Sequence, residues 1–254
     1  MADYIEVRGV RIGEGMPKIC VPIVGVTAEE IKAAAHVAKM AEPDVVEWRA
    51  DWFSCVEEEK QVRTVLEELR KILGNIPLLF TFRTKEEGGE RMLDQAAYVR
   101  LNKKVAQSGL VDLLDVELFT GDAAVKELVA CAHAAGVKVI ASNHDFKKTP
   151  AADVIAERLF RMKELGADIP KIAVMPADRA DVLTLLAATG QAAAGIKGPI
   201  ITMSMAGTGL VSRICGETFG SALTFGTAGK ASAPGQMDAK DLRRILTLLH
   251  EDMA

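Results

Sequence analysis

The sequence predicts an α/β fold, a (β/α)8 TIM barrel that forms one domain over residues 1–254. Short β-branched runs alternate with longer segments rich in Ala, Leu, Glu and Lys, which favours a parallel sheet covered by helices. Eight such repeats occur without a glycine-rich dinucleotide turn. This number of repeats favours a closed barrel over a doubly wound sheet.

Individual elements follow from the period of the apolar residues and from start and stop signals. Thr27 precedes a helical segment, and Gly74 and Gly109 follow two others. Residues 5–12 alternate around Gly9 and predict a small β-hairpin that closes the barrel floor. The expected strands are 18–26, 44–50, 77–83, 111–118, 137–144, 170–175, 199–205 and 222–226. The expected helices are 28–40, 57–73, 91–108, 122–135, 151–165, 179–194 and 237–250, with a short one near 209–214.

The composition argues against several classes of binding partner and cofactor. A net charge of −4 and an aromatic content of 5% argue against nucleic acid or an anionic membrane as a partner. No apolar stretch is long enough to span a bilayer, and the charged start of the chain does not fit an export signal. The four cysteines lie far apart, and the four histidines show no metal-ligand spacing. We therefore expect a cytoplasmic protein with reduced thiols and with neither a metal nor another cofactor.

Charged side chains gather where the predicted strands end, which is where barrel enzymes carry their chemistry. Period-two alternation places Glu47, Arg49 and Asp51 on one face of the second strand. Thr81 and Arg83 share one face of the third. Because burying charges without a function is costly, we expect a binding or catalytic site at these strand ends. Further charged residues near strand ends are Asp115, Glu117, His144, Lys171 and Arg213.

Lys171 lies in an apolar, β-branched run at residues 169–176. A buried lysine must lose its charge or find a partner, because an isolated buried ammonium is costly. A neutral amine can form a Schiff base with a ketone, and His144 could then move protons as general base and acid. Lys171 lies early in its run, so the strand begins nearer Ala167 or the side chain reaches up from an inner layer. The alternative is a lysine at the strand mouth with its head in water.

Some of these residues also have structural interpretations. Glu47 and Arg49 could form an ion pair at the barrel rim. Asp115 and Glu117 are expected to hold Lys171 or an arginine, rather than to act directly in catalysis.

Seven short motifs extend through almost the whole chain: Glu-Trp-Arg-Ala-Asp at 47–51, Phe-Arg-Thr-Lys-Glu-Glu-Gly-Gly at 82–89, Ser-Asn-His-Asp-Phe at 142–146, Lys-Ile-Ala-Val-Met-Pro at 171–176, Met-Ser-Met at 203–205, Ser-Arg at 212–213 and Ala-Ser-Ala-Pro-Gly-Gln at 231–236. In this order and spacing, the chain resembles the type I 3-dehydroquinate dehydratases of the shikimate pathway. The resemblance implies a hydro-lyase that converts 3-dehydroquinate to 3-dehydroshikimate, the third step toward aromatic amino acids. It also implies a homodimer.

The resemblance also implies roles for individual residues. Lys171 would form the Schiff base with the substrate ketone, and His144 would be the general base and acid. Glu87, which directly precedes the glycine pair, would orient His144 in preference to Glu86. The loop at 227–235 has the small-residue composition of a mobile lid. The implied substrate-binding residues are Glu47, Arg49 and Arg83 for hydroxyls, Arg213 for the carboxylate, and Ser232 and Gln236, with Met203 and Met205 filling the barrel and forming the pocket wall.

Two other functions stay open. A class I aldolase-like lyase would share the barrel and the lysine but break a carbon–carbon bond, often on a phosphorylated substrate. Residues 226–230 superficially resemble a phosphate loop, although they lead into the dehydratase-like motif. A non-catalytic metabolite-binding barrel would need the arginines, but not both Lys171 and His144. Arg213 could alternatively hold the loop that follows it in place, through an ion pair with Glu217.

Overall fold

Strands and helices alternate along the chain as the apolar period predicts. The computed structural model describes residues 4–229 and 235–253. The strands are β1 (Ile5–Val7), β2 (Val10–Ile12), β3 (Lys18–Ile23), β4 (Val45–Arg49), β5 (Leu78–Thr81), β6 (Leu113–Glu117), β7 (Lys138–Asp145), β8 (Ile169–Val174), β9 (Ile201–Ser204), β10 (Leu223–Thr227) and β11 (Met237–Asp238). The helices are α1 (Ala28–Met40), α2 (Glu59–Leu73), α3 (Gln95–Ala106), α4 (Asp122–Ala134), α5 (Ala152–Glu164), α6 (Arg179–Gly195), α7 (Val211–Ile214), α8 (Gly216–Phe219) and α9 (Ala239–Met253), with short 3-10 turns η1 (Ala50–Trp52), η2 (Lys85–Glu87) and η3 (Leu118–Thr120).

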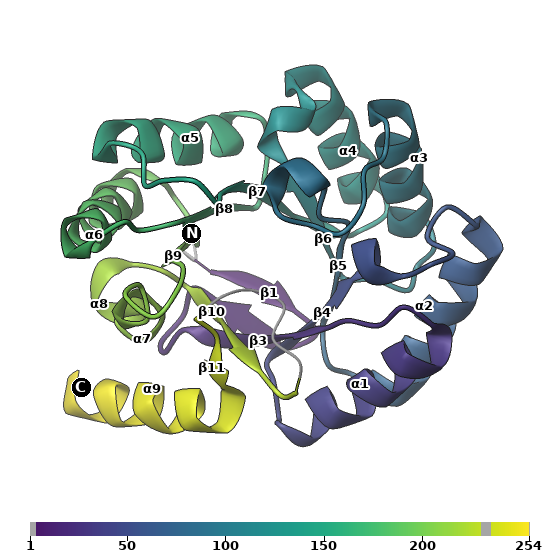
Figure 1. Ribbon diagram of the computed structural model, residues 1–254, viewed down its shortest axis with the longest axis horizontal. Coiled ribbons are helices and arrows are strands. Elements are labelled where there is room, and N and C mark those ends of the chain that lie inside the picture. Colours follow the sequence, from purple (N-terminus) through teal and green to yellow (C-terminus); the bar gives the residue numbers. More distant parts are fainter. Residues whose placement is uncertain (1–3, 230–234, 254) are drawn as a thin grey trace.

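Over the described residues, parallel strands form one curled sheet in the order β11-β10-β3-β4-β5-β6-β7-β8-β9. Helices surround the sheet on its outer side (Figure 1). This α/β architecture is TIM-barrel-like, in agreement with the predicted fold class. No helix in the part of the chain that the structure describes is long and apolar enough to cross a bilayer.

The curl brings β9, at one end of the strand order, beside β10. Ile200, just before β9, forms a parallel bridge with Ser221, just before β10. The backbone N–H of Ala222 donates to the carbonyl of Ile200 at 2.8 Å. The hydroxyl of Ser221 accepts from the backbone N–H of Thr202 at 3.0 Å. β9 and β10 are therefore joined by a short bridge and a side-chain hydrogen bond, and not by a continuous ladder of backbone hydrogen bonds.

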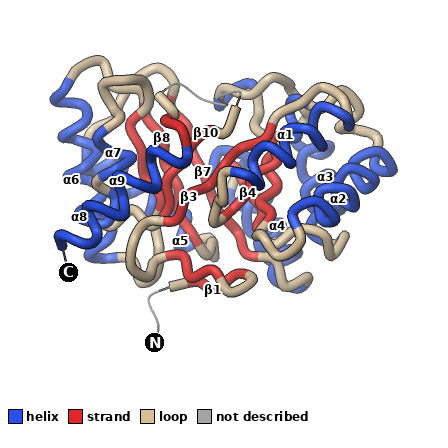
Figure 2. Tube along the Cα trace, turned by 90° about the horizontal axis from the view of Figure 1, so that it is seen from below, coloured by secondary structure: helices blue, strands red, loops and turns tan. Residues whose placement is uncertain are grey.

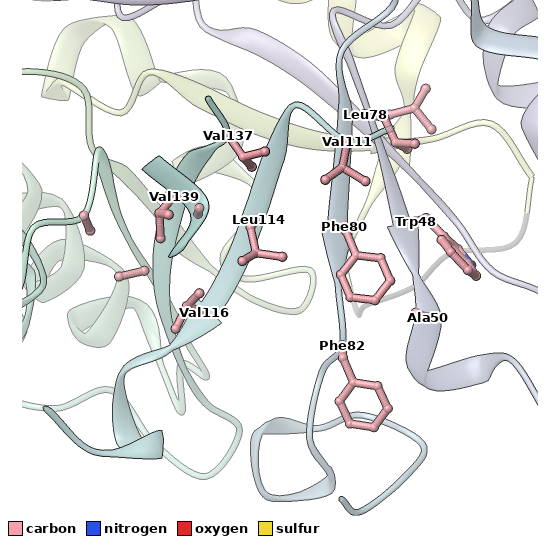
Figure 3. Packing of buried hydrophobic residues seen from close by; sticks show 14 of the residues in the cluster. Trp48, Ala50, Leu78, Phe80, Phe82, Val111, Leu114, Val116, Val137 and Val139 are labelled. Carbon is pink, nitrogen blue, oxygen red and sulfur yellow. The ribbon is translucent and has the colours of Figure 1, made fainter. Parts of the chain in front are cut away.

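Alternation along the strands sorts the buried side chains into two regions. Outward residues such as Trp48, Phe80 and Phe82, labelled in Figure 3, belong to one buried apolar cluster with residues of the surrounding helices, such as Leu66 of α2. The rings of Trp48 and Phe80 meet edge to face, with their centroids 5.5 Å apart. The inward residues nearest the amino ends of the strands are apolar, and polar side chains follow toward the carboxyl ends. This inner apolar layer contains Cys20, Val45, Leu79, Leu113, Ile140, Ile169, Ile201 and Leu223.

The hairpin of β1 and β2 lies at the amino ends of the sheet strands (Figure 2). Its turn residues Arg8 and Gly9 have positive φ values of 49° and 82°, as a tight two-residue hairpin turn requires. Arg8 Nε donates to Asp112 Oδ1, directly before β6, at 2.6 Å. The buried side chains of Val7 and Ile12 belong to the same apolar cluster as the inner layer of the sheet.

Several helix starts differ from the sequence prediction, and two of them have a clear physical cause. The last helix begins at Ala239 and not at residue 237, because Met237 and Asp238 pair with β10 as β11. The third helix begins later than residue 91, because the side chain of Asp94 caps it by accepting from the Ala97 backbone N–H at 2.7 Å. Periodicity alone cannot locate either start, since one depends on a distant strand and the other on a local cap.

Replacing Ile12 by alanine should lower the free energy of unfolding by about 2–5 kcal/mol, because this fully buried side chain would leave a cavity in the inner cluster. Met40→Ala is the matched control. Met40 is 74% exposed on α1, so this change should cost less than about 0.5 kcal/mol. Urea unfolding followed by circular dichroism measures both. Equal, small losses would show that the hairpin does not seal the apolar interior.

Candidate active site

A cavity lies at the carboxyl ends of the strands, which is where barrel enzymes bind their substrates. It unites residues from β4, β7, β8, β9, β10, α7 and the loop after β5. Every predicted site residue lines it except Ser232, which lies outside the described residues. The lining residues are Glu47, Arg49, Arg83, Glu87, Gly88, His144, Phe146, Lys171, Ala173, Met203, Met205, Arg213, Phe225 and Gln236.

Lys171 is the third residue of β8, which begins at Ile169, so a strand start near Ala167 is wrong. The amine instead reaches the cavity from an inner layer. Its Nζ is 3.3 Å from Asp115 Oδ2 and 4.5 Å from the centroid of the Phe225 ring. The residue is only 3% exposed, so a lysine with its head in bulk water is also wrong. The carboxylate and the ring face together fix the position of the amine.

Arg83 is enclosed by carboxylates. Its Nη1 donates to Glu117 Oε1 at 2.8 Å, and its Nη2 donates to Asp115 Oδ1 at 2.8 Å. Burial alone would lower the pKa of Arg83, but these carboxylates outweigh burial and raise it. Burial would raise the pKa of Asp115, but Arg83 and Lys171 hold it below its ordinary value. The prediction that Asp115 and Glu117 hold the lysine or an arginine is confirmed.

His144 and Glu87 are in direct contact. Glu87 Oε2 lies 3.0 Å from His144 Nδ1 and accepts the backbone N–H of His144 at 3.0 Å. Glu86 is exposed, so of the two glutamates Glu87 occupies the position beside the imidazole. Burial raises the pKa of Glu87 to about 8, against the opposing charge of Arg83. Burial, followed by the charges of Arg83 and Lys171, lowers the pKa of His144 well below its ordinary value.

These two shifts make the ionisation of the pair interdependent. His144 Nε2 can accept a proton as a neutral base only when Nδ1 carries one. An ionised Glu87 stabilises that tautomer by accepting from Nδ1–H, whereas a protonated Glu87 would donate to Nδ1 and favour the other tautomer. The basicity of Nε2 therefore depends on the charge of Glu87.

Two glycines allow Glu87 to reach this position. Gly88 has a φ of 84°, and a Cβ atom there would lie 2.3 Å from the ring of Phe146. A Cβ atom on Gly89 would lie 1.9 Å from the carbonyl oxygen of Arg83. A side chain at either glycine would displace the turn η2 that carries Glu87.

The end of β4 provides a second buried ion pair. Arg49 forms a two-pronged contact with Asp51, with Nε–Oδ1 and Nη2–Oδ2 distances of 2.9 Å each. β4 ends at Arg49, so Asp51 belongs to the turn η1 and not to the strand face on which it was predicted. The turn still brings it back to Arg49. Glu47 accepts from Thr81 Oγ1 at 2.8 Å.

Arg213, on α7, is 1% exposed, and its Nη1 lies 3.7 Å from Met203 Sδ. Burial lowers its pKa to about 10, which leaves the guanidinium charged at neutral pH. Glu217, its alternative partner, lies 2.7 Å from His250 Nδ1 instead. Gln236 lines the same cavity. The lid predicted at 227–235 falls largely outside the described residues, which resume at 235.

Sequence reasoning assigned no role to several residues of the site region, among them Phe225, Asn143 and Arg158. Phe225 carried a detectable signal, since it follows Leu223 at period two on the last barrel strand. Asn143 stands in the motif at 142–146, but the motif does not reveal its contact with Arg158, which depends on how α5 packs against β7. Arg158 carried no signal in the sequence. No group of three or more His, Cys, Asp or Glu within residues 4–229 and 235–253 is placed to hold a metal.

A TIM-barrel-like fold with a buried lysine and a histidine–carboxylate pair in one cavity at the strand ends defines a barrel enzyme that acts on a small molecule. The family model described as Type I 3-dehydroquinase matches residues 19–253. The chain therefore belongs to the type I 3-dehydroquinase family of hydro-lyases.

Relatives and solved structures agree with this family. The chain is 54% identical over 254 residues to the 3-dehydroquinate dehydratase of Clostridioides difficile (strain 630), with both chains covered in full. It is 53% identical over 249 residues to that of Listeria monocytogenes serotype 4a, covering 98% of this chain and 99% of the relative. A crystal structure of the type I enzyme from Clostridium difficile with covalently modified comenic acid superposes with a TM-score of 0.96 at 53% identity, over 99% of this chain and 100% of the other. The 3-dehydroquinate dehydratase of Geobacillus kaustophilus also gives a TM-score of 0.96, at 37% identity and 99% coverage of both chains.

Glu87→Gln should change how stability depends on pH. The pKa of Glu87 is raised in the folded protein, so wild type should lose stability as pH rises from about 4.5, its ordinary value, to about 8. Because glutamine does not titrate, the free energy of unfolding of the variant should rise relative to that of wild type between pH 5 and pH 9, by an amount on the order of a few kcal/mol. Urea unfolding at both pH values measures this. The exposed Glu86→Gln is the control, and parallel behaviour of the two variants would contradict the raised pKa.

Proposed function

We propose that this chain converts 3-dehydroquinate to 3-dehydroshikimate through a Schiff base on Lys171, with His144 as general base and acid. The observation that carries the proposal is that the amine of Lys171 and the His144–Glu87 pair line one small cavity. An enclosed amine can act as a nucleophile toward a ketone, and a neutral imidazole can move protons beside it.

The chemistry uses both groups in sequence. Lys171 Nζ adds to the ketone carbon, and loss of water gives an iminium ion. His144 Nε2 removes a proton from the adjacent carbon. The C–H electron pair forms a carbon–carbon double bond, and the C=N π electrons move onto nitrogen, which gives an enamine. The enamine expels the hydroxyl on the next carbon, which takes the proton from the imidazolium and leaves as water. Hydrolysis of the conjugated iminium ion releases the enone product and the free amine.

The charges around the cavity suit a polyhydroxylated carboxylate. Arg213 is a desolvated guanidinium whose fork matches two carboxylate oxygens, so we assign it the substrate carboxylate. Glu47 and Arg49 lie on the inward face of β4, where they can contact hydroxyls. Arg83 also lines the cavity, and its enclosure by carboxylates gives it the additional role of holding Glu117 and Asp115. Met203, Met205, Gln236 and, by resemblance, Ser232 complete the proposed substrate contacts.

The comparisons support the proposal. The relatives described above carry the name 3-dehydroquinate dehydratase, and one solved structure contains covalently modified comenic acid. We also propose four properties that the sequence predicts. They are a single domain, a closed barrel with the β1–β2 hairpin as its floor, a homodimer and a cytoplasmic location. Light scattering of the purified protein tests the homodimer directly.

Turnover of 3-dehydroquinate by the purified chain tests the function. The conjugated enone product absorbs in the ultraviolet, so its appearance reports dehydration. Carbon–carbon cleavage fragments without the enone would indicate the aldolase-like alternative. Binding without any turnover would indicate a metabolite-binding barrel.

His144→Ala should separate covalent binding from elimination. Lys171 can still capture the ketone, so borohydride should still trap an adduct while turnover falls by about 10²- to 10⁴-fold, the usual effect of losing a general acid–base. Lys171→Ala should lose both turnover and trapping. Intact-protein mass spectrometry measures the adduct. Persistent labelling of Lys171→Ala would move the nucleophile to another residue.

Arg213→Lys should raise KM clearly although it keeps the charge, because an ammonium cannot form the two-pronged carboxylate contact. Arg213→Ala should cost more, about 2–4 kcal/mol in substrate binding. A ligand without the carboxylate should bind wild type and both variants almost equally. If the variants instead lose thermal stability and keep their preference for the carboxylate, Arg213 has a structural role.

A further inference from the structure

The His144–Glu87 pair separates two cavities. On one side lies the substrate cavity described above. On the other side lies a more open cavity between the loop after β5 and helix α5, which is also lined by Glu87, His144 and Phe146. Asn143 and Arg158 line only this rear cavity. The pair therefore has neighbours that cannot touch the substrate.

A chain of hydrogen bonds approaches Glu87 from this rear side. Arg158 Nη1, on α5, donates to Asn143 Oδ1 at 2.9 Å. Asn143 Nδ2 then donates to Glu87 Oε1 at 3.0 Å. Glu87 Oε2, the other carboxylate oxygen, faces His144. Each oxygen of Glu87 thus has a defined neighbour, and the amide of Asn143 has defined partners at both its oxygen and its nitrogen.

Arg158 determines which way that amide points. Asn143 is 2% exposed, and its amide could rotate to place either the oxygen or the nitrogen toward Glu87. The guanidinium of Arg158 can only donate, so it fixes the amide oxygen toward itself and the NH₂ group toward Glu87. The face of the Phe119 ring, 5.4 Å from Arg158 Cζ, supports the guanidinium from the side.

We propose that Arg158 is a positioning residue for the dehydration, acting through Asn143 to favour the ionised form of Glu87 and to align it with His144. The proposal rests on the proposed function of the His144–Glu87 pair and adds the residues that control it. The hydrogen bond from Asn143 lowers the pKa of Glu87 and so opposes the effect of burial. Losing it should make Glu87 harder to ionise, and His144 would then hold the proton on Nδ1 less often.

Other charged groups face this pair and remain in place when Arg158 is changed. These groups influence the pKa values of Glu87 and His144 in wild type and in the Arg158 variants alike. They are Arg83 after β5, Asp115 and Glu117 on β6, Lys171 on β8 and Arg49 on β4, with Glu86, Asp145 and Lys147 on the rim of the rear cavity.

The test compares pH profiles of kcat for wild type, Arg158→Met, Arg158→Lys and Asn143→Ala. Arg158→Met should lower kcat about 2- to 10-fold near neutral pH, as expected for one lost hydrogen bond, and recover toward pH 9. KM should stay unchanged, because Arg158 does not line the substrate cavity. Arg158→Lys should restore part of the loss. Arg158→Met in the Asn143→Ala background should add nothing, because the path is already broken.

Arg161→Met is the matched control. Arg161 lies on the same helix and forms ion pairs with Asp122 and Glu164. Its replacement should leave the pH profile as in wild type. A loss for Arg158→Met that is equal at every pH, or that adds fully to Asn143→Ala, would overturn the proposal.

A second measurement does not depend on turnover. Nitrogen NMR of the imidazole, assigned with His144→Ala, should show a smaller population of the Nδ1–H tautomer in Arg158→Met than in wild type. If wild type does not dehydrate 3-dehydroquinate but the tautomer shifts, the proposed function fails and the positioning role stands. If wild type is active and the tautomer does not shift, only the positioning role fails.

Discussion

The carboxylate of Asp115 is the interaction on which the rest of the site depends. Its Oδ1 accepts from Arg83 at 2.8 Å and from Ser142 at 2.7 Å, while its Oδ2 lies 3.3 Å from the Lys171 amine. Removing one partner from such a buried group leaves an uncompensated charge, which typically costs about 3–5 kcal/mol. Arg83 and Ser142 hold Asp115 in place, and Asp115 in turn holds Lys171. The amine of Lys171 therefore stays at the cavity wall.

Arg83 connects Asp115 to the His144–Glu87 pair. The carboxylates of Glu117 and Asp115 offset its charge, and its Nη1 lies 3.4 Å from Glu87 Oε2. Glu117 also accepts from the backbone N–H of Thr84 at 2.8 Å, which ties down the turn that delivers Glu87. Burial raises the pKa of the Glu87 carboxyl, and burial together with the nearby cations lowers the pKa of the His144 imidazole. The network therefore affects both where His144 and Glu87 lie and how readily each of them is protonated.

Much of this arrangement was predictable because period-two alternation is a local property of a strand. It placed Glu47 and Arg49 on one face of their strand, and the order of β and α segments indicated the barrel-like fold. Glu87 needed the family resemblance, because its position depends on a glycine turn that periodicity does not describe. The contact of Arg158 with the site could not be predicted, since it depends on how α5 packs against β7. The start of α9 was predicted wrongly for a similar reason, because it depends on the pairing of β11 with β10.

The central claim is that Lys171 attacks the ketone while the other residues hold the substrate in reach of the imidazole. A crystal structure of the protein reduced with borohydride in the presence of 3-dehydroquinate tests it most directly. We expect a single bond between Lys171 Nζ and the former ketone carbon, with the carboxylate on Arg213 and His144 Nε2 facing the adjacent carbon. A ligand bound without a covalent bond, or attached to another residue, would contradict it.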